Sequence, residues 1–88
     1  MVKGKLDSGF PFELDEEMLD DMRFIELLNA TQEDPVKVVD LANFALGKEQ
    51  KERLYKHLED ENGRVKTQAF SDAMEEIFEK AGESVKNL

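Results

Sequence analysis

The sequence predicts an all-α protein, a small bundle of about four short helices with an extended N-terminal arm. Two observations predict this fold. Apolar residues recur every three or four positions along the last two thirds of the chain, which is the spacing of the buried face of a helix. The pattern is interrupted only at Asp34-Pro35, at Leu46-Gly47 and at Glu61-Asn62-Gly63-Arg64, where residues that begin helices or form turns occur.

The chain of 88 residues is long enough for one domain with a single small core. Residues 1–9 contain Lys, Gly, Asp and Ser with little to bury, so we expect a flexible N-terminal tail there. We expect a single helical domain over residues 10–82 and a polar C-terminal tail over residues 83–88.

The N-terminal arm leads into the first helix. Apolar and other residues alternate from Phe10 to Leu14, and Pro11 cannot lie in the interior of a helix. We therefore expect an extended arm or a short edge strand. Asp15 follows as a suitable N-cap, and the apolar stripe after it predicts a first helix that ends near residues 29–32.

Start and stop signals predict three further helices. Asp34 is a candidate N-cap and Pro35 suits the first helical position, so a second, central helix begins here. Gly47 suits the left-handed turn that would end it. A charged third helix is expected over about residues 48–60, a turn at Asn62-Gly63, and a fourth helix over about residues 67–81.

Composition and charge exclude several classes of partner. The formal net charge of −9 repels phosphates and anionic lipid surfaces, so we expect neither a nucleic acid nor a membrane as partner. The chain has no cysteine, which excludes disulfides and thiolate metal sites. We expect no signal peptide and no membrane span. The acidity serves either solubility alone or the attraction of a basic partner.

Nothing in the sequence resembles a catalytic set, so we expect no enzymatic activity and no cofactor. His57 is the only histidine, and no second His or Cys lies at metal-ligand spacing from it. Its only candidate partners are Asp60 and Glu61, one helical turn away. We interpret His57 as an ordinary residue of a helix surface.

The segment around Gly63 resembles part of a calcium-binding loop. With Gly63 at the sixth loop position, Asp60 and Asn62 take ligand positions. In that register, however, Leu58 and Ala69 stand where the first and last carboxylates belong. We expect no metal here, and a divalent-ion sensor built on Asp60 and Asn62 is the weakest of the alternatives.

The chain carries more large apolar side chains than the helices of a small bundle usually bury. These residues can close the core, with the arm folded back over the first helix. They can also form a hydrophobic surface for a partner helix or for a second copy of the chain. Both interpretations stay open, and the candidate partner-binding residues are Phe10, Phe12, Leu14, Phe24 and Phe44.

Several motifs resemble a known family. The most telling are Leu46-Gly47-Lys48-Glu49-Gln50, then His57-Leu58, and Asn62-Gly63-Arg64-Val65. With the segment Asp-Met-Arg-Phe-Ile-Glu-Leu-Leu before them, they resemble the small tail assembly chaperones of long-tailed bacteriophages and prophages of Gram-positive bacteria. The resemblance covers Asp20 to Lys80 and consists of helix and turn elements rather than a catalytic signature.

The resemblance implies a mostly helical, non-enzymatic protein of the bacterial host cytoplasm. It implies that the chain shields the tape measure protein from aggregation and helps the major tail protein to polymerise around it, and it is compatible with a homo-oligomer. The family has no ligand set to transfer, so no binding residue follows from it. The alternative is a small acidic adaptor or regulatory protein that binds a partner helix.

Overall fold

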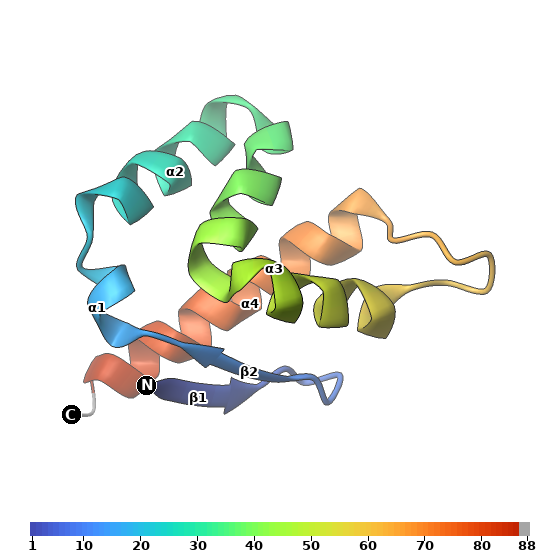
Figure 1. Ribbon diagram of the computed structural model, residues 1–88, viewed down its shortest axis with the longest axis horizontal. Helices are drawn as coiled ribbons and strands as arrows, with labels where there is room; N and C mark the ends of the chain where they lie inside the picture. The colour runs from blue at the N-terminus through green and yellow to red at the C-terminus, as the bar shows by residue number, and fades with distance from the viewer. Residues whose placement is uncertain (87–88) are drawn as a thin grey trace.

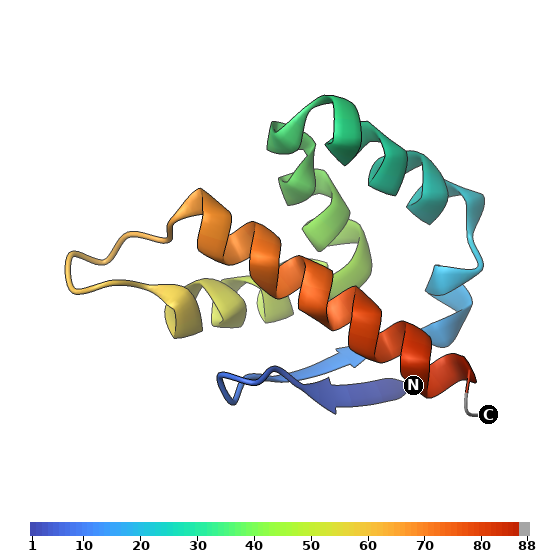
Figure 2. The ribbon, with the colours of Figure 1, turned by 180° about the vertical axis from the view of Figure 1, so that it is seen from behind.

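The computed structural model describes residues 1–86, and the fold is predominantly helical with a small β-hairpin at the N-terminus (Figure 1). The long helix α4 (Thr67–Lys86) runs along the hairpin, the second half of α3 (Val38–Leu58) lies next to the hairpin, and α2 (Met22–Glu33) lies farther from it (Figure 2). The elements are β1 (Val2–Lys5), β2 (Pro11–Leu14), α1 (Glu16–Leu19), α2 (Met22–Glu33), the 3₁₀ turn η1 (Pro35–Lys37), α3 (Val38–Leu58) and α4 (Thr67–Lys86).

The hairpin corrects two predictions. Residues 1–9, expected as a flexible tail, contain β1, and the all-α class omits the antiparallel pair of β1 with β2. Val2 lies opposite Leu14 and Gly4 lies opposite Phe12. The alternation of Val2, Gly4 and Leu6 with lysines carried this signal, because one face of a strand repeats every second residue.

Gly4 is required by its strand partner. A Cβ atom at this position would lie 2.5 Å from Cζ of Phe12, because the phenyl ring covers the glycine. The ring cannot move aside easily, since Phe12 is only 2 % exposed and is enclosed by the core. A glycine beneath a cross-strand aromatic ring therefore allows the hairpin to close.

The first predicted helix is divided into α1 and α2. Asp15 caps α1 as expected, its Oδ1 accepting the backbone N–H of Glu17 at 3.0 Å. The chain then breaks at Asp20, and Oδ1 of Asp21 accepts the N–H of Arg23 at 2.8 Å to start α2. The prediction of one continuous helix was wrong. The Asp21 carboxylate accepts a backbone N–H that would otherwise bond to a carbonyl oxygen of the preceding helical turn, so a new helix can begin there.

Local start and stop signals were read correctly at the next boundaries. Asp34 accepts the N–H of Val36 at 3.1 Å, and Pro35 begins η1. Gly47 adopts φ 78° and ψ 160° inside α3, so residues 38–46 and 48–58 are two helices joined at a kink, as predicted. Figure 1 shows the sharp change of direction there.

The helix α4 is longer than predicted. It begins at Thr67 as expected but continues past Gly82 to Lys86. The predicted polar tail over residues 83–88 is thus helical over 83–86, and its last two residues lie outside the described part of the chain.

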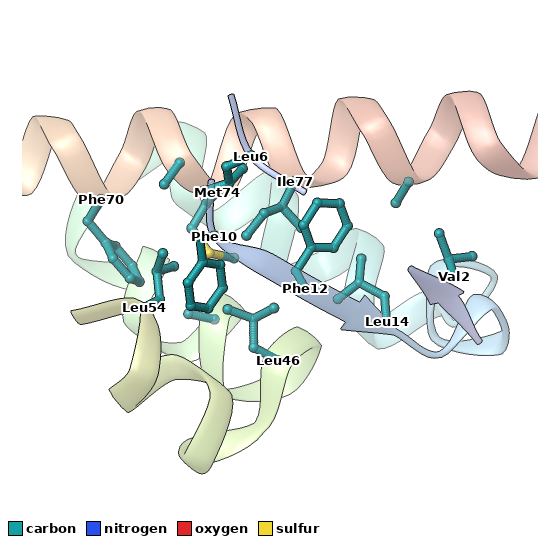
Figure 3. Packing of buried hydrophobic residues seen from close by; sticks show 13 residues of the cluster. Val2, Leu6, Phe10, Phe12, Leu14, Leu46, Leu54, Phe70, Met74 and Ile77 are labelled. Carbon is teal, nitrogen blue, oxygen red and sulfur yellow. The ribbon is translucent and has the colours of Figure 1, made fainter. Parts of the chain in front are cut away.

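The core lies between the hairpin, α3 and α4, as Figure 3 shows. The deepest large side chains come from all three of these parts. They are Phe12, Leu14, Leu54, Met74 and Ile77. The hairpin is therefore not an appendage but one wall of the core.

A buried amide joins the hairpin to α3. The side chain of Gln50 is 9 % exposed, and its Oε1 accepts the backbone N–H of Glu13 at 2.8 Å. Its Nε2 donates to the carbonyl oxygen of Glu13 at 3.0 Å and to that of Leu46 at 3.1 Å. The amide thus pairs with the free edge of β2 as a neighbouring strand would, and both backbone groups of Glu13 are satisfied.

The ammonium group of Lys80 joins the hairpin loop to α4. Nζ of Lys80 donates to the Lys5 carbonyl oxygen at 2.6 Å and to Asp7 Oδ1 at 2.9 Å, and lies 3.1 Å from Glu76 Oε2. Glu76 also accepts the N–H of Asp7 at 2.7 Å. The hydrogen bonds that Lys80 donates to the carboxylates of Asp7 and Glu76 raise its pKa above the ordinary value of 10.5.

We expect Gly4→Ala to lower the free energy of unfolding by about 1–3 kcal/mol, because the new methyl group overlaps the Phe12 ring. Gly82→Ala is the matched control: nothing lies within 4 Å of its Cβ position, and α4 continues through it. The control should leave stability unchanged or raise it by roughly 0.5–1 kcal/mol. Urea unfolding followed by circular dichroism measures both, and equal stability of the two variants would contradict the packing argument.

We expect Gln50→Met to cost about 1–3 kcal/mol, because it leaves the N–H and the carbonyl oxygen of Glu13 without partners. Gln68→Met removes an exposed glutamine that bonds only to the Asp72 side chain, and should change stability by less than about 0.5 kcal/mol. Hydrogen exchange at the Glu13 amide should accelerate in the first variant only. An unchanged rate there would show that the amide pairing does not hold β2.

The raised pKa of Lys80 predicts an alkaline loss of stability. Stability from the charged lysine is fully present below the unfolded value of 10.5 and is lost as the pH rises through the higher folded value. Lys80→Met should be less stable at neutral pH and should lose less stability from about pH 9 to about pH 12. Parallel stability curves for the two proteins over that range would refute this role.

Candidate functional site

The structure places most of the predicted partner-binding residues in the core. Phe10, Phe12 and Leu14 are 6 %, 2 % and 1 % exposed, and Phe24 is 6 % exposed. Only Phe44 is half-buried. The first four therefore offer no docking surface, which corrects their assignment as partner-binding residues. The arm closes the core, as one of the two interpretations held, but it packs against α3 and α4 rather than over the first helix.

Apolar surface remains exposed elsewhere. Val36 is 75 % exposed in η1, and Val39 is 39 % exposed in the first turn of α3. Met22 and Ile25 are 68 % and 46 % exposed on α2. The valines follow Pro35 in a β-branched cluster, and this run of apolar residues around the start of a helix was the sequence signal that the candidate list missed.

The exposed valines border an apolar groove, the valine groove, with a cavity volume of about 450 Å³. One wall is η1 with the first turn of α3, and the other is formed by the end of α3, the segment before α4, and the start of α4. Its lining residues are Pro35, Val36, Val38, Val39, Tyr55, Val65, Thr67, Gln68, Phe70 and Ser71.

Aromatic packing supports the second wall of the valine groove. The rings of Tyr55 and Phe70 lie 5.2 Å apart in a tilted arrangement, and Nζ of Lys51 lies 5.5 Å from the Tyr55 ring centroid on α3. These contacts fix the two aromatic rings, so the groove is preformed.

The lining of the valine groove contains no Asp, Glu, Lys, Arg or His. Its polar side-chain groups are the Tyr55, Thr67 and Ser71 hydroxyls and the Gln68 amide. A surface of this composition recognises a partner by shape and apolar burial, with few directional contacts. The groove is therefore suited to an apolar side chain or to one face of an amphipathic helix.

His57 lies away from the valine groove. Its Nε2 is 2.9 Å from Oγ of Ser8, and its ring lies 5.4 Å from that of Phe10. This Ser–His contact could not be predicted from local sequence, because the two residues are 49 positions apart. Among the side chains that the structure describes, no third group bonds to the imidazole to orient it as a base. The contact ties the hairpin loop to α3.

The loop around Gly63, which resembles part of a calcium-binding loop, is held together by the side chain of Asp60. Oδ1 of Asp60 accepts the backbone N–H groups of Asn62 at 2.9 Å and Arg64 at 3.0 Å, and Gly63 takes φ 75°. Within the described residues there is no group of three or more His, Cys, Asp or Glu side chains that could hold a metal ion. None of the helices described has the length and apolar character needed to cross a membrane.

No family model, curated protein or solved structure matches this chain. We therefore infer the function from the surface of the molecule and from the resemblance of its motifs.

Proposed function

We propose that the protein is a non-enzymatic tail assembly chaperone that binds the tape measure protein in the bacterial host cytoplasm during phage tail morphogenesis. The observation that carries this proposal is the valine groove, an apolar, uncharged groove bordered by exposed Val36 and Val39. An exposed apolar groove on a small, highly charged protein is a surface for a protein partner.

The size of the groove favours reversible binding. Complete burial of a valine or similar side chain contributes roughly 1.5–3 kcal/mol, and part of this gain is lost to the entropy of association. A few such side chains therefore give moderate affinity. A chaperone must release its client when the major tail protein polymerises around the tape measure protein, and moderate affinity allows that release.

The motifs of the resemblance shape the fold around the groove, and one of them supplies the lining residue Val65, which favours the proposal. Gly47 and Gln50 of the first motif produce the kink of α3 and hold the hairpin against it. Asp60 and Gly63 form the turn before Val65, and Val65 belongs to the groove lining. The alternative, an adaptor or regulatory protein that binds another helix, would use the same groove and would differ only in its partner.

The proposal predicts that coexpression raises the soluble fraction of a tape measure fragment from the same phage genome. Val36→Asp combined with Val39→Asp should abolish this effect, because carboxylates would be buried on binding. The folded state should tolerate both changes, since the side chains are exposed and lie near a helix start where acids are favourable. The soluble fraction of the fragment after centrifugation is the measurement.

Met22→Asp is the matched control, since it also replaces an exposed apolar residue, on α2 and outside the valine groove. This control should solubilise the fragment as the unchanged chain does. No gain in solubility with the unchanged chain would reject the chaperone function. A gain that survives the paired valine substitutions would reject the valine groove as its site.

A further inference from the structure

A second groove lies between α2, α3 and α4, with a cavity volume of about 510 Å³. We call it the acidic groove. Its lining residues are Leu28, Thr31, Gln32, Leu41, Met74, Glu75, Phe78 and Glu79. It shares no residue with the valine groove, and the first half of α3 contributes to both.

The backbone of α2 lies apart from that of α4 over much of its length, as Figure 2 shows. The two helices meet through Phe24 and Phe78, whose rings lie 5.2 Å apart edge to face. Past this contact, Leu28 and Gln32 lie farther along α2 and border the groove, with buried Leu41 and Met74 beneath them. Ile25, 46 % exposed, continues the same side of α2, since it precedes Leu28 and Gln32 by three and seven positions.

The charged residues in the lining are both acidic. Glu75 and Glu79 are exposed and lie one turn apart on α4, where like charges repel. Among residues 1–83, neither carboxylate lies within 4.0 Å of a basic side chain. The neighbouring Glu76 differs, because Lys80 pairs with it. A repulsive pair beside an apolar groove, with no basic partner among residues 1–83, is relieved by a cation from another molecule.

The net charge of the protein is concentrated in the segments that surround this groove. Residues 15–40 hold nine acidic and two basic side chains, and residues 67–83 hold five acidic and one basic. Residues 41–66, by contrast, hold six basic and five acidic side chains. The net charge of −9 therefore comes mainly from residues 15–40 and 67–83, and it is not evenly distributed along the chain.

We propose that the acidic groove binds a cationic amphipathic helix of a partner protein, with its apolar face on half-buried Leu28 and Phe78 and on exposed Ile25 beside them, and its Lys or Arg residues beside Glu75 and Glu79. The apolar side chains of the groove supply the contact area, and the negative charges of Glu75 and Glu79 select a cationic partner. This proposal depends on residues outside the valine groove and holds whether or not the client of that groove is a tape measure protein.

Fluorescence anisotropy with a labelled peptide tests the proposal. The probe is an amphipathic helix of about eighteen residues built from Leu, Ala and Lys, with leucines along one face. Glu75→Gln combined with Glu79→Gln should weaken its binding about fivefold, because two rim charge pairs are lost. The fold should tolerate these changes, since they remove a repulsion. The matched control is Glu17→Gln with Glu61→Gln, which changes net charge equally at exposed sites outside both grooves and should alter affinity less than about twofold.

A second peptide with Glu in place of Lys should not bind, and added salt should weaken binding of the first. Amide chemical shifts on peptide addition should change at Leu28 and Thr31. Absence of binding, equal loss in both double variants, or shifts confined to Val36 and Val39 would overturn the proposal. Loss of tape measure solubilisation with peptide binding intact would reject the proposed function alone.

Discussion

The fold depends on hydrogen bonds between the side-chain amide of Gln50 and the backbone of Glu13. Gln50 occupies the edge of β2 and satisfies both backbone groups of Glu13, while its Nε2 also bonds to the turn before it in α3. Without that partner, β2 would bury an unpaired edge against a helix, which is costly. The kink at Gly47 precedes Gln50 by less than one turn and begins the helical segment that carries it. The second half of α3 and the hairpin therefore form one unit.

This arrangement determines where apolar surface stays exposed. The hairpin brings five apolar side chains to the core, and they cover the second half of α3 and much of α4. None of its residues lines either groove. The hairpin thus uses the large apolar residues near the N-terminus for stability, and the surfaces left for partners lie around η1, α2, α3 and α4. Two grooves of different chemistry result, one uncharged and one acidic.

Local chemistry explains which parts of the fold could be predicted. Asp34 with Pro35, Gly47, and Asn62 with Gly63 determine helix ends and turns within a few residues, so these boundaries were predicted correctly. The break at Asp20-Asp21 was missed because an aspartate can either sit on a helix surface or cap a new helix. The hairpin was missed because its stability comes from Gln50 and α4, far away in the sequence.

The same distinction applies to the candidate site. Side-chain size suggested Phe10, Phe12, Leu14 and Phe24 as partner-binding residues, but the largest apolar side chains contribute most to a core and are buried first. Exposed Val36 and Val39 were part of a recognisable apolar cluster, yet their exposure depends on where η1 lies relative to α4. The distance between η1 and α4 cannot be predicted from any pattern along the sequence.

The contacts of Lys80 have a consequence for biosynthesis. Its Nζ meets the carbonyl oxygen of Lys5, 75 positions earlier, and Asp7 meets Glu76 across 69 positions. β1 therefore cannot be held in place until α4 has been synthesised. Until then its apolar face is uncovered in the nascent chain, and closing so large a loop makes this a late event in folding.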